Sequence, residues 1–534
     1  MKLEPIVVKD VPHLNPSGPG VQLVDMYVQP PHETFAAYYS ENRLLFNEWL
    51  LGGENAGHSL EEYWGHMADT PHFQSWEFAD EIFHNPTSWI PLRMWGDDVS
   101  VTKNKSLNVL HCSSCVAEMV SVVFSKLLCA AFPLGFILPA GMDKIVNVLV
   151  WSFICLMRGE WPELDWDLNP FPSHHWRSEK HGFLAGGLRA LVCEISGDWK
   201  FLRELLRLPQ WYNKMHCCHI CKALKIPFGV LSFVDFSKSA AHRRPENQRS
   251  DASYMLAVAG NRPAITFLPW FVLAMVLWDY MHVVCLGTAQ HLVGNTLIEM
   301  CANNRFGFHH IGRFEIRLGL QLRAAWLAFK TWAKENVVDH SQLQFTRGSF
   351  SMKKAASAPY FKSKAGNTMD VLLWLEHLQP SVQASHGHLQ AIAICVRSLA
   401  RTWRLCKIGR RFFTRAEARS FHESTMRFLL AYRILNLEAA LLGKASWVLV
   451  PKFHAMDHLA VSARRTLRNP GSHWCFCDES YVGKIRNVVP SLRVGRLVSL
   501  RVLQRHYSGA KLRLAGRVPF KPGSFKRRTR AQRG

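Results

Sequence analysis

The apolar run LRALVCEI, at residues 188–195, ends at Gly197-Asp198 and is followed by an amphipathic segment and a dithiol pair, Cys218 and Cys221. A short apolar run bounded by a Gly-Asp step is typical of a buried strand. Asp198 is then either the cap of the helix that follows or a residue that carries chemistry. In the second case the cysteines brace the acid from behind.

The segments before this run predict more strands and one helix. SWIPLRMW is typical of a strand and is followed by Gly96-Asp97-Asp98, and residues 141–158 fit a helix. VSVTK and LNVLHCSS predict two further short strands, separated by the turn-like KNKS. The predicted order is three strands, a helix and a fourth strand, with acids at the ends of the first and fourth.

The rest of the chain divides by composition and periodicity. Helical spacing with basic polar faces dominates from about residue 300, and SHWCFCDESYVGKIRNVV predicts a helix with Glu479 in its first turn. We predict an α/β fold in five parts: a loosely organised N-terminal region at 1–87, the first part of the core at 88–300, an all-helical insertion at 301–465, the last helix of the core at 466–505, and a basic tail at 506–534.

Net charge favours a polyanionic partner. The 534 residues contain 64 Lys and Arg against 41 Asp and Glu, and 48% of them are hydrophobic, which excludes a disordered chain. The 55 residues after Glu479 hold 15 Lys or Arg and no acid. Such a tail is a solvated segment, a contact to phosphates or a nuclear-import signal.

The 14 scattered cysteines and the absence of an apolar leader at the N-terminus favour a reducing compartment.

Two apolar runs bear on membrane association. IVNVLVWSFICLM at 145–157 is shorter than a bilayer span, and AITFLPWFVLAMVLW at 264–278 contains Pro269 and ends at Asp279. We expect both to lie in the protein core and expect no membrane partner. A membrane-associated protein that uses the 264–278 run is the alternative.

Three acids have the spacing of a nuclease-type carboxylate site. Phosphodiester chemistry on nucleic acids commonly uses two divalent metal ions, and Mg²⁺ prefers carboxylate oxygens. A ribonuclease H-like core places such acids at the end of its first strand, at its fourth strand and on a later helix. Asp97, Asp198 and Glu479 occupy these places in the predicted order. Asp98 and Asp478 are the alternatives to Asp97 and Glu479.

Several short motifs together resemble cut-and-paste DDE transposases, most closely the Plavaka-type (Kyakuja-Dileera-Zisupton) group and its CACTA-like relatives. The resemblance covers about residues 88–500 and depends on the order and spacing of the motifs. They are, in chain order, Gly96-Asp97, Asp198-Trp199, the pair Cys218 and Cys221, Asp279 and His282 in DYMH, VPKFHAMDHLA, and Glu479 in CFCDES.

This resemblance implies a ribonuclease H-like core interrupted by a helical insertion, and DNA transposition as the function. Asp97, Asp198 and Glu479 would hold two Mg²⁺ or Mn²⁺ ions. It also implies DNA and a second copy of the chain as partners, a nuclear location and no small-molecule substrate. The rival hypothesis is a catalytically inactive, transposon-derived DNA-binding or scaffold protein.

The dithiol has the spacing of a zinc half-site. A C2H2 finger would need two closely spaced histidines about 12 residues on, and a redox CxxC belongs to a thioredoxin-like setting, so both are disfavoured. Structural zinc on Cys218 and Cys221 remains, with Asp279 and His282 as expected further ligands and Cys217 and His219 as alternatives. Unligated buried thiols are the competing interpretation.

Candidate DNA contacts lie in two places. Lys452 and His454 precede the last acid, and Arg527 and Arg528 lie in the basic tail. HAMDH has the HxxxH spacing of a metalloprotease but lacks its general-base Glu, so a protease is disfavoured. In RTWRLCKIGRRFFTR, at 401–415, the aromatic side chains either stack on bases or belong to the core of an amphipathic helix.

Overall fold

The computed structural model describes residues 3–14, 19–102, 105–117, 123–133, 137–308, 310, 312–378, 387–488 and 498–516. The protein is mixed α/β, with 53% of residues in helices and 14% in strands. It forms two compact units. Unit 1 comprises Met1–Pro209, Ser250–Leu277 and Cys475–Gly534, and unit 2 comprises Gln210–Arg249 and Trp278–Trp474.

Unit 1 is built on one six-stranded mixed sheet, with the strand order β1-β2-β5-β4-β3-β6. Strand β6 runs parallel to β3, and the other neighbouring strands are antiparallel. The strands are β1 Ile6–Leu14, β2 Val21–Val28, β3 Trp89–Thr102, β4 Lys105–Ser114, β5 Leu127–Pro133 and β6 Arg189–Gly197.

The predicted order of three strands, a helix and a fourth strand is found between β3 and β6, but two of the segments differ. Residues 99–102, VSVT, continue β3, because Asp97, Asp98 and Val99 remain paired with β4. The third strand is instead β5, whose residues LLCAAFP are almost all buried. A continuous apolar run gives no alternating pattern, so β5 was missed.

Residues 1–87, for which we expected little organisation, hold two strands and several helices. Strands β1 and β2 extend the sheet beyond β5. The helical elements are α1 Pro31–Glu41, α2 Arg43–Phe46, η1 Asn47–Leu51, η2 Gly53–Asn55, α3 Ala56–Ala68, α4 Pro71–Gln74, α5 Ala79–His84 and η3 Pro86–Ser88. Buried aromatic side chains stabilise this region, although its sequence has no regular periodicity. Tyr38, Trp49 and Tyr63 are buried and make edge-to-face ring contacts.

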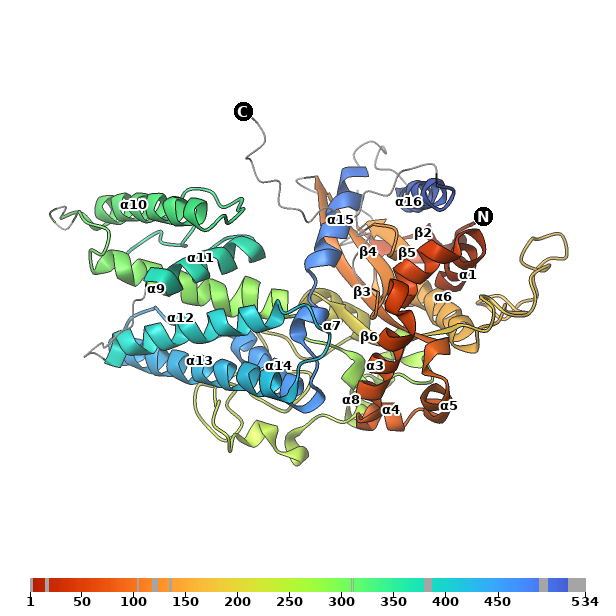
Figure 1. Cartoon of the computed structure of the whole chain (residues 1–534), viewed down its shortest axis with the longest axis horizontal. Coiled ribbons are helices and arrows are strands. Elements are labelled where there is room, and N and C mark those ends of the chain that lie inside the picture. The colour runs from red at the N-terminus through yellow and green to blue at the C-terminus, as the bar shows by residue number, and fades with distance from the viewer. Residues whose placement is uncertain are drawn as a thin grey trace. The chain divides into compact units, whose positions relative to one another are not determined.

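The later helices of unit 1 pack around the sheet (Figure 1). Helix α6 (Pro139–Arg158) contacts β1, β2 and β6, whereas α15 (Phe476–Val488) contacts β3 and α16 (Val498–Leu514) contacts β5. Helices α7 (Trp199–Leu206) and α8 (Asp251–Ala257) complete the unit. The helices predicted at 141–158 and around Glu479 are α6 and α15.

The two apolar runs take different structures. The first belongs to α6, which among the described residues is the one helix long and apolar enough to cross a membrane by length and composition. Of its most apolar stretch, 61% is buried within the protein, as also occurs in core helices, so this is weak evidence for a membrane segment. Residues 264–277 form only short 3-10 turns, at Ala264–Phe267 and Leu273–Met275, and Val276 pairs with Ile195 of β6.

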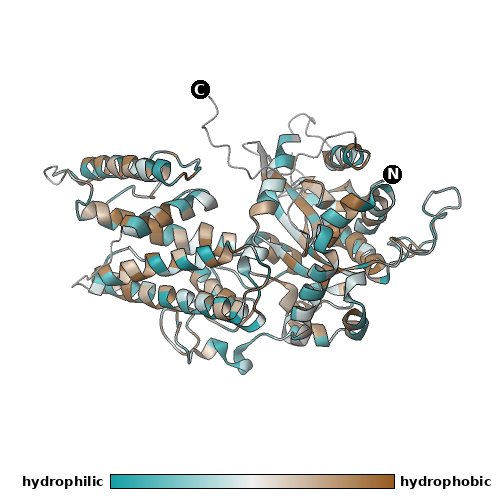
Figure 2. Ribbon diagram, in the orientation of Figure 1, coloured by the Kyte–Doolittle hydropathy of each residue, from teal (hydrophilic) through white to brown (hydrophobic). Residues whose placement is uncertain are grey.

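Unit 2 is helical, and its long helices have the amphipathic colouring expected from the sequence (Figure 2). Helices α12 and α13 pack side by side as a hairpin, and α14 packs on α13. The elements are η9 Met281–Thr288, α9 Ala289–Ala302, α10 Phe314–Glu335, α11 Ala365–Leu378, α12 Gly387–Cys406, α13 Arg415–Leu441 and α14 Pro451–Thr466. The loop of residues 210–249 also belongs to this unit.

Candidate functional site

Two Gly-Asp steps lie next to each other at the ends of the parallel strands β3 and β6. Gly96 pairs with Gly197, so Asp97 and Asp198 immediately follow a matched pair in the register. Both glycines are sterically required. A Cβ at Gly96 would lie 2.3 Å from the Phe201 ring, and one at Gly197 would lie 2.4 Å from the Gly96 carbonyl oxygen.

Asp97 and Glu479 come together on one face of the sheet. Successive residues of a strand point to opposite faces, so Asp97 shares a face with Trp95. The Trp95 indole contacts Cys475, just before α15, with Nε1 3.0 Å from the sulfur. The carboxylate oxygens of Asp97 and Glu479 lie within 4.8 Å of each other. Burial, together with the Glu479 and Asp198 carboxylates, holds the pKa of Asp97 well above its usual range.

Asp198 is the N-cap of α7. Its Oδ1 accepts a hydrogen bond of 2.6 Å from the backbone N–H of Phe201. The carboxylate is half-buried, and its charge contributes to the raised pKa of Asp97. Asp198 is therefore a helix cap and also the third acid beside Asp97, since a carboxylate has a second oxygen and further lone pairs.

The structure distinguishes Asp97 and Glu479 from their sequence neighbours. Asp98 faces α7, and its carboxylate pairs with Lys200 of that helix at 2.7 Å and accepts a hydrogen bond from the Asn108 amide of β4 at 3.0 Å. Asp478 is 2% exposed and pairs with Lys126 at 2.5 Å. Burial raises the pKa of Asp478, but the nearby cations, Lys126 first and then His111 and Arg93, outweigh burial and hold the pKa below its usual value. Asp98 and Asp478 are thus engaged elsewhere.

Asp478 anchors the start of α15, which makes it a target for a stability test. Asp478→Asn leaves the buried Lys126 ammonium without a counterion and should lower the free energy of unfolding by about 3–5 kcal/mol at pH 7. Because the folded-state pKa of Asp478 is lowered, its contribution is present above about pH 4 and is lost as the pH falls through that lowered value. Chemical denaturation at several pH values measures the difference.

The control for this test is an exposed ion pair of the same unit. Glu81 pairs with Arg189 at 2.6 Å, and the Glu81 side chain is 53% exposed. Glu81→Gln should change the free energy of unfolding by less than about 1 kcal/mol. Equal effects of the two substitutions would contradict the anchoring role of Asp478.

Four buried ligand atoms in unit 2 form a second site. Cys218 and Cys221 lie in the 210–249 loop, and His454 and His458 are one turn apart on α14. The Cys221 sulfur is 3.2 Å from His454 Nε2 and 3.3 Å from His458 Nε2, and the two Nε2 atoms are 3.1 Å apart. Tetrahedral zinc bonds of about 2.0–2.3 Å place ligand atoms roughly 3.3–3.8 Å apart, and the separations here lie at or just below the lower end of that range, so the donor set and its spacing are close to those of a zinc site.

The surroundings orient these ligands. The Phe233 carbonyl is 3.1 Å from His454 Nδ1, which favours a proton on Nδ1 and a lone pair on Nε2 toward the cysteines. The backbone N–H of Ile220 donates to the Cys218 sulfur at 3.3 Å. A hydrogen bond from Cys218 lowers the pKa of Cys221 against the effect of burial, which favours the thiolate that zinc requires.

The residues expected to complete the dithiol site lie elsewhere in unit 2. Asp279 and His282 pair with each other, with 2.6 Å between Asp279 Oδ2 and His282 Nδ1, and the group that contains the cysteines is completed by His454 and His458 instead. His219 packs on the Trp278 ring with a centroid distance of 4.7 Å. The HxxxH spacing was the available signal, because residues four apart share one face of a helix.

The expected DNA contacts have three outcomes. His454 is 1% exposed and lies in the Cys2His2 cluster, so the prediction that it contacts phosphate is wrong. Lys452 is half-buried, and its ammonium donates to the Leu286 carbonyl at 2.7 Å. Arg527 and Arg528 lie outside the described residues.

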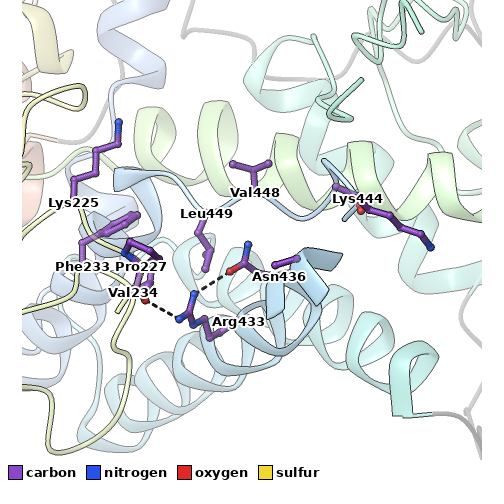
Figure 3. A pocket seen from close by; sticks show the side chains of 11 residues that line it. Lys225, Pro227, Phe233, Val234, Arg433, Asn436, Lys444, Val448 and Leu449 are labelled. Atoms are coloured by element: carbon purple, nitrogen blue, oxygen red, sulfur yellow. Dashed lines mark hydrogen bonds between the residues drawn. The ribbon is translucent and has the colours of Figure 1, made fainter. Parts of the chain in front are cut away.

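A pocket of about 300 Å³ lies where the dithiol loop meets α13 (Figure 3). Phe233 lines it while its carbonyl faces His454. Arg433 joins the two elements, because its guanidinium donates to the Pro227 carbonyl at 2.8 Å and to the Asn436 side chain at 2.9 Å. Lys225 and Lys444 extend away from Arg433, so the cations that line the pocket do not converge on one ligand.

No family model matches the chain, and no curated protein matches it.

Proposed function

We propose that the chain is a transposon-derived, DDE transposase-like protein that binds DNA and carries out metal-dependent strand cleavage and transfer. Unit 1 is then a ribonuclease H-like core, and unit 2 is the largely helical insertion that interrupts it. The zinc site of unit 2 has a structural role. The protein acts in the nucleus and as an oligomer of identical chains, since two transposon ends must be joined.

The observation that carries this proposal is the arrangement of three acids from distant parts of the chain. Asp97 and Asp198 follow the matched glycines of two parallel strands, and Glu479 approaches Asp97 from the first turn of α15. The strand order β5-β4-β3-β6 supports it further, because a ribonuclease H-like core also places its fourth strand beside and parallel to its first.

The carboxylates suit hard divalent ions. Mg²⁺ and Mn²⁺ prefer oxygen ligands. In the free protein the neighbouring carboxylates raise the pKa of Asp97. A bound cation would reduce the repulsion between these carboxylates. Asp97, Asp198 and Glu479 would hold the ions. When bound, a metal pair supplies activation of the attacking oxygen and stabilisation of the leaving oxygen.

Two phosphoryl-transfer steps make up the proposed reaction. In the first, a water oxygen bonds to phosphorus, the P–O3′ bond breaks, and a 3′-hydroxyl and a 5′-phosphate remain, with one proton released to solvent. In the second, the 3′-hydroxyl oxygen bonds to a phosphorus of target DNA, the P–O3′ bond of that strand breaks, and the proton of the attacking hydroxyl is balanced by the one that the leaving 3′-oxygen takes up. No co-reactant other than water is needed.

A nicking assay tests the proposal. Wild-type protein with Mg²⁺ should nick DNA that carries candidate transposon ends, whereas Asp198→Ala should lose this activity while still binding DNA. Loss of roughly 10³-fold or more is expected where several kcal/mol of transition-state stabilisation is removed. If wild type and Asp198→Ala are equally inactive and both bind DNA, the enzymatic function is refuted.

One observation favours the alternative of an inactive DNA-binding or scaffold protein. Asp198 uses Oδ1 to cap α7, a role that would keep this acid in place without catalysis. In that case nicking stays at background for every variant, and DNA binding alone remains.

A further inference from the structure

The α12–α13 hairpin of unit 2 carries an excess of cations. Residues 397–427 contain nine Lys or Arg and two acids. Eight of these cations are exposed, and Arg410 among them pairs with Glu417. We name the other seven the basic stripe: Arg397, Arg401 and Arg404 on α12, Lys407 directly after it, and Arg415, Arg419 and Arg427 on α13. The stripe is distinct from both metal-binding candidates.

The stripe is a continuous surface rather than scattered charge. Arg397, Arg401 and Arg404 recur at helical spacing on the exposed side of α12, whereas Val396 and Leu399 are buried on the opposite side. The Arg401 guanidinium lies 3.4 Å from the Ser420 hydroxyl, which brings the α12 row beside the start of α13. The two helices pack side by side along their length (Figure 1).

The aromatic residues of 401–415 are part of the core and not of this surface. Trp403 is 7% exposed, and Phe412 and Phe413 are 7% and 2% exposed. Stacking on bases is therefore excluded for these three rings in this fold. The Lys407 ammonium lies 5.3 Å from the Trp403 ring centroid, which is within the range of a cation–π interaction.

Two acids lie next to the stripe. Glu376 pairs with Arg404, and Glu423 lies 3.9 Å from Arg427. Glu417 pairs with Arg410 in the connection between the helices. A surface with this charge excess attracts a regular polyanion, and residues four apart on a helix are separated by about 6 Å, roughly two base-pair rises of duplex DNA.

We propose that the basic stripe binds the phosphate backbone of double-stranded DNA without reading its sequence. The inference takes its partner from the proposed function and assigns that partner a surface. Cations that contact phosphates release condensed counterions, so the affinity must fall as salt rises. Exposed guanidinium groups on rigid helices are suited to this role because they present several donors to phosphate oxygens.

The test measures the binding of a fluorescent 30-bp duplex by anisotropy at several salt concentrations, in an Asp198→Asn background that prevents cleavage. The triple variant Arg397→Gln, Arg401→Gln, Arg419→Gln should bind at least roughly tenfold more weakly near 0.1 M salt. The slope of log affinity against log salt should shrink by about 2–3, close to one for each lost contact.

Two further variants make the test specific. A control triple variant removes three exposed cations from α10 of the same unit: Arg323→Gln, Lys330→Gln and Lys334→Gln. Its affinity for the DNA duplex should stay within about twofold of that of the parent protein. Replacing the same three stripe residues by Lys keeps the charge and should retain most of the binding. The Lys variant also shows whether any loss in the Gln variant comes from charge or from misfolding.

Several results would overturn the inference. These are an unchanged affinity and slope in the Gln triple variant, an equal loss in the α10 variant, or a stripe-dependent preference for RNA over duplex DNA. Because DNA binding is measured in a variant that cannot cleave, the result of the binding test does not depend on the result of the nicking assay. Stripe-dependent DNA binding by a protein that never nicks DNA would retain the stripe and reject the enzyme.

Discussion

Replacing Cys218 and Cys221 by Ser should unfold unit 2 and remove one zinc ion per chain from the purified protein. The cluster joins the 210–249 loop to α14 across 233 residues of sequence, through Cys221 and His454. Zinc binding to such a set is coupled to folding, so its loss should cost roughly 5 kcal/mol or more. Metal analysis and thermal unfolding, with and without a strong chelator, measure both effects.

A buried cysteine outside the cluster is the matched control. Cys301 on α9 is 2% exposed, and burial raises the pKa of its thiol to about 12, which keeps the thiol protonated. Cys301→Ser makes the same chemical change in the same unit and should cost only about 1–2 kcal/mol with zinc retained. A zinc-free wild type that is as stable as the double variant would show that the thiols are unligated core residues.

Asp97→Asn should abolish DNA nicking and at the same time stabilise the metal-free protein. Burial and the Glu479 and Asp198 carboxylates raise the pKa of Asp97, so the folded state is penalised increasingly as pH rises above about 4, where the unfolded carboxyl ionises. Asn has no carboxyl that must be kept protonated in the folded state, so the substitution should add about 1–2 kcal/mol at pH 7, or roughly 2–4 °C. The loss of activity should be roughly 10³-fold or more.

A bound divalent ion should reverse this order. Mg²⁺ or Mn²⁺ stabilises only the protein that binds it, so it should raise the thermal midpoint of the wild type and leave that of Asp97→Asn nearly unchanged. Asp98→Asn is the control, since Asp98 faces Lys200 and Asn108 and should keep the metal-induced shift. A metal-induced shift that survives in Asp97→Asn and disappears in Asp98→Asn would contradict the proposal, because it would place the metal on the face of β3 that carries Asp98.

Local patterns predicted much of unit 1. Gly-Asp steps mark where β3 and β6 meet, and their glycines are required because a Cβ at Gly96 would enter the Phe201 ring. The placement of Glu479 in the first turn of α15 follows from helical periodicity. The strands of the first 87 residues and β5 escaped prediction because their apolar residues do not alternate regularly.

By itself the sequence determined β3, β4, α6, β6 and α15 in their order and the presence of three acids at the ends of such elements, because capping, turn and periodicity signals act over a few residues. Only the tertiary structure decided which acids meet. Alternation along β3 turns Asp97 toward α15 and Asp98 toward Lys200, while Asp478 pairs with the buried Lys126. It also decided the ligand set of the dithiol, since His454 and His458 reach it by chain folding over more than two hundred residues. The HxxxH spacing marks the histidine pair, but no local pattern connects it to the cysteines, and only the packing of the loop on α14 reveals that contact.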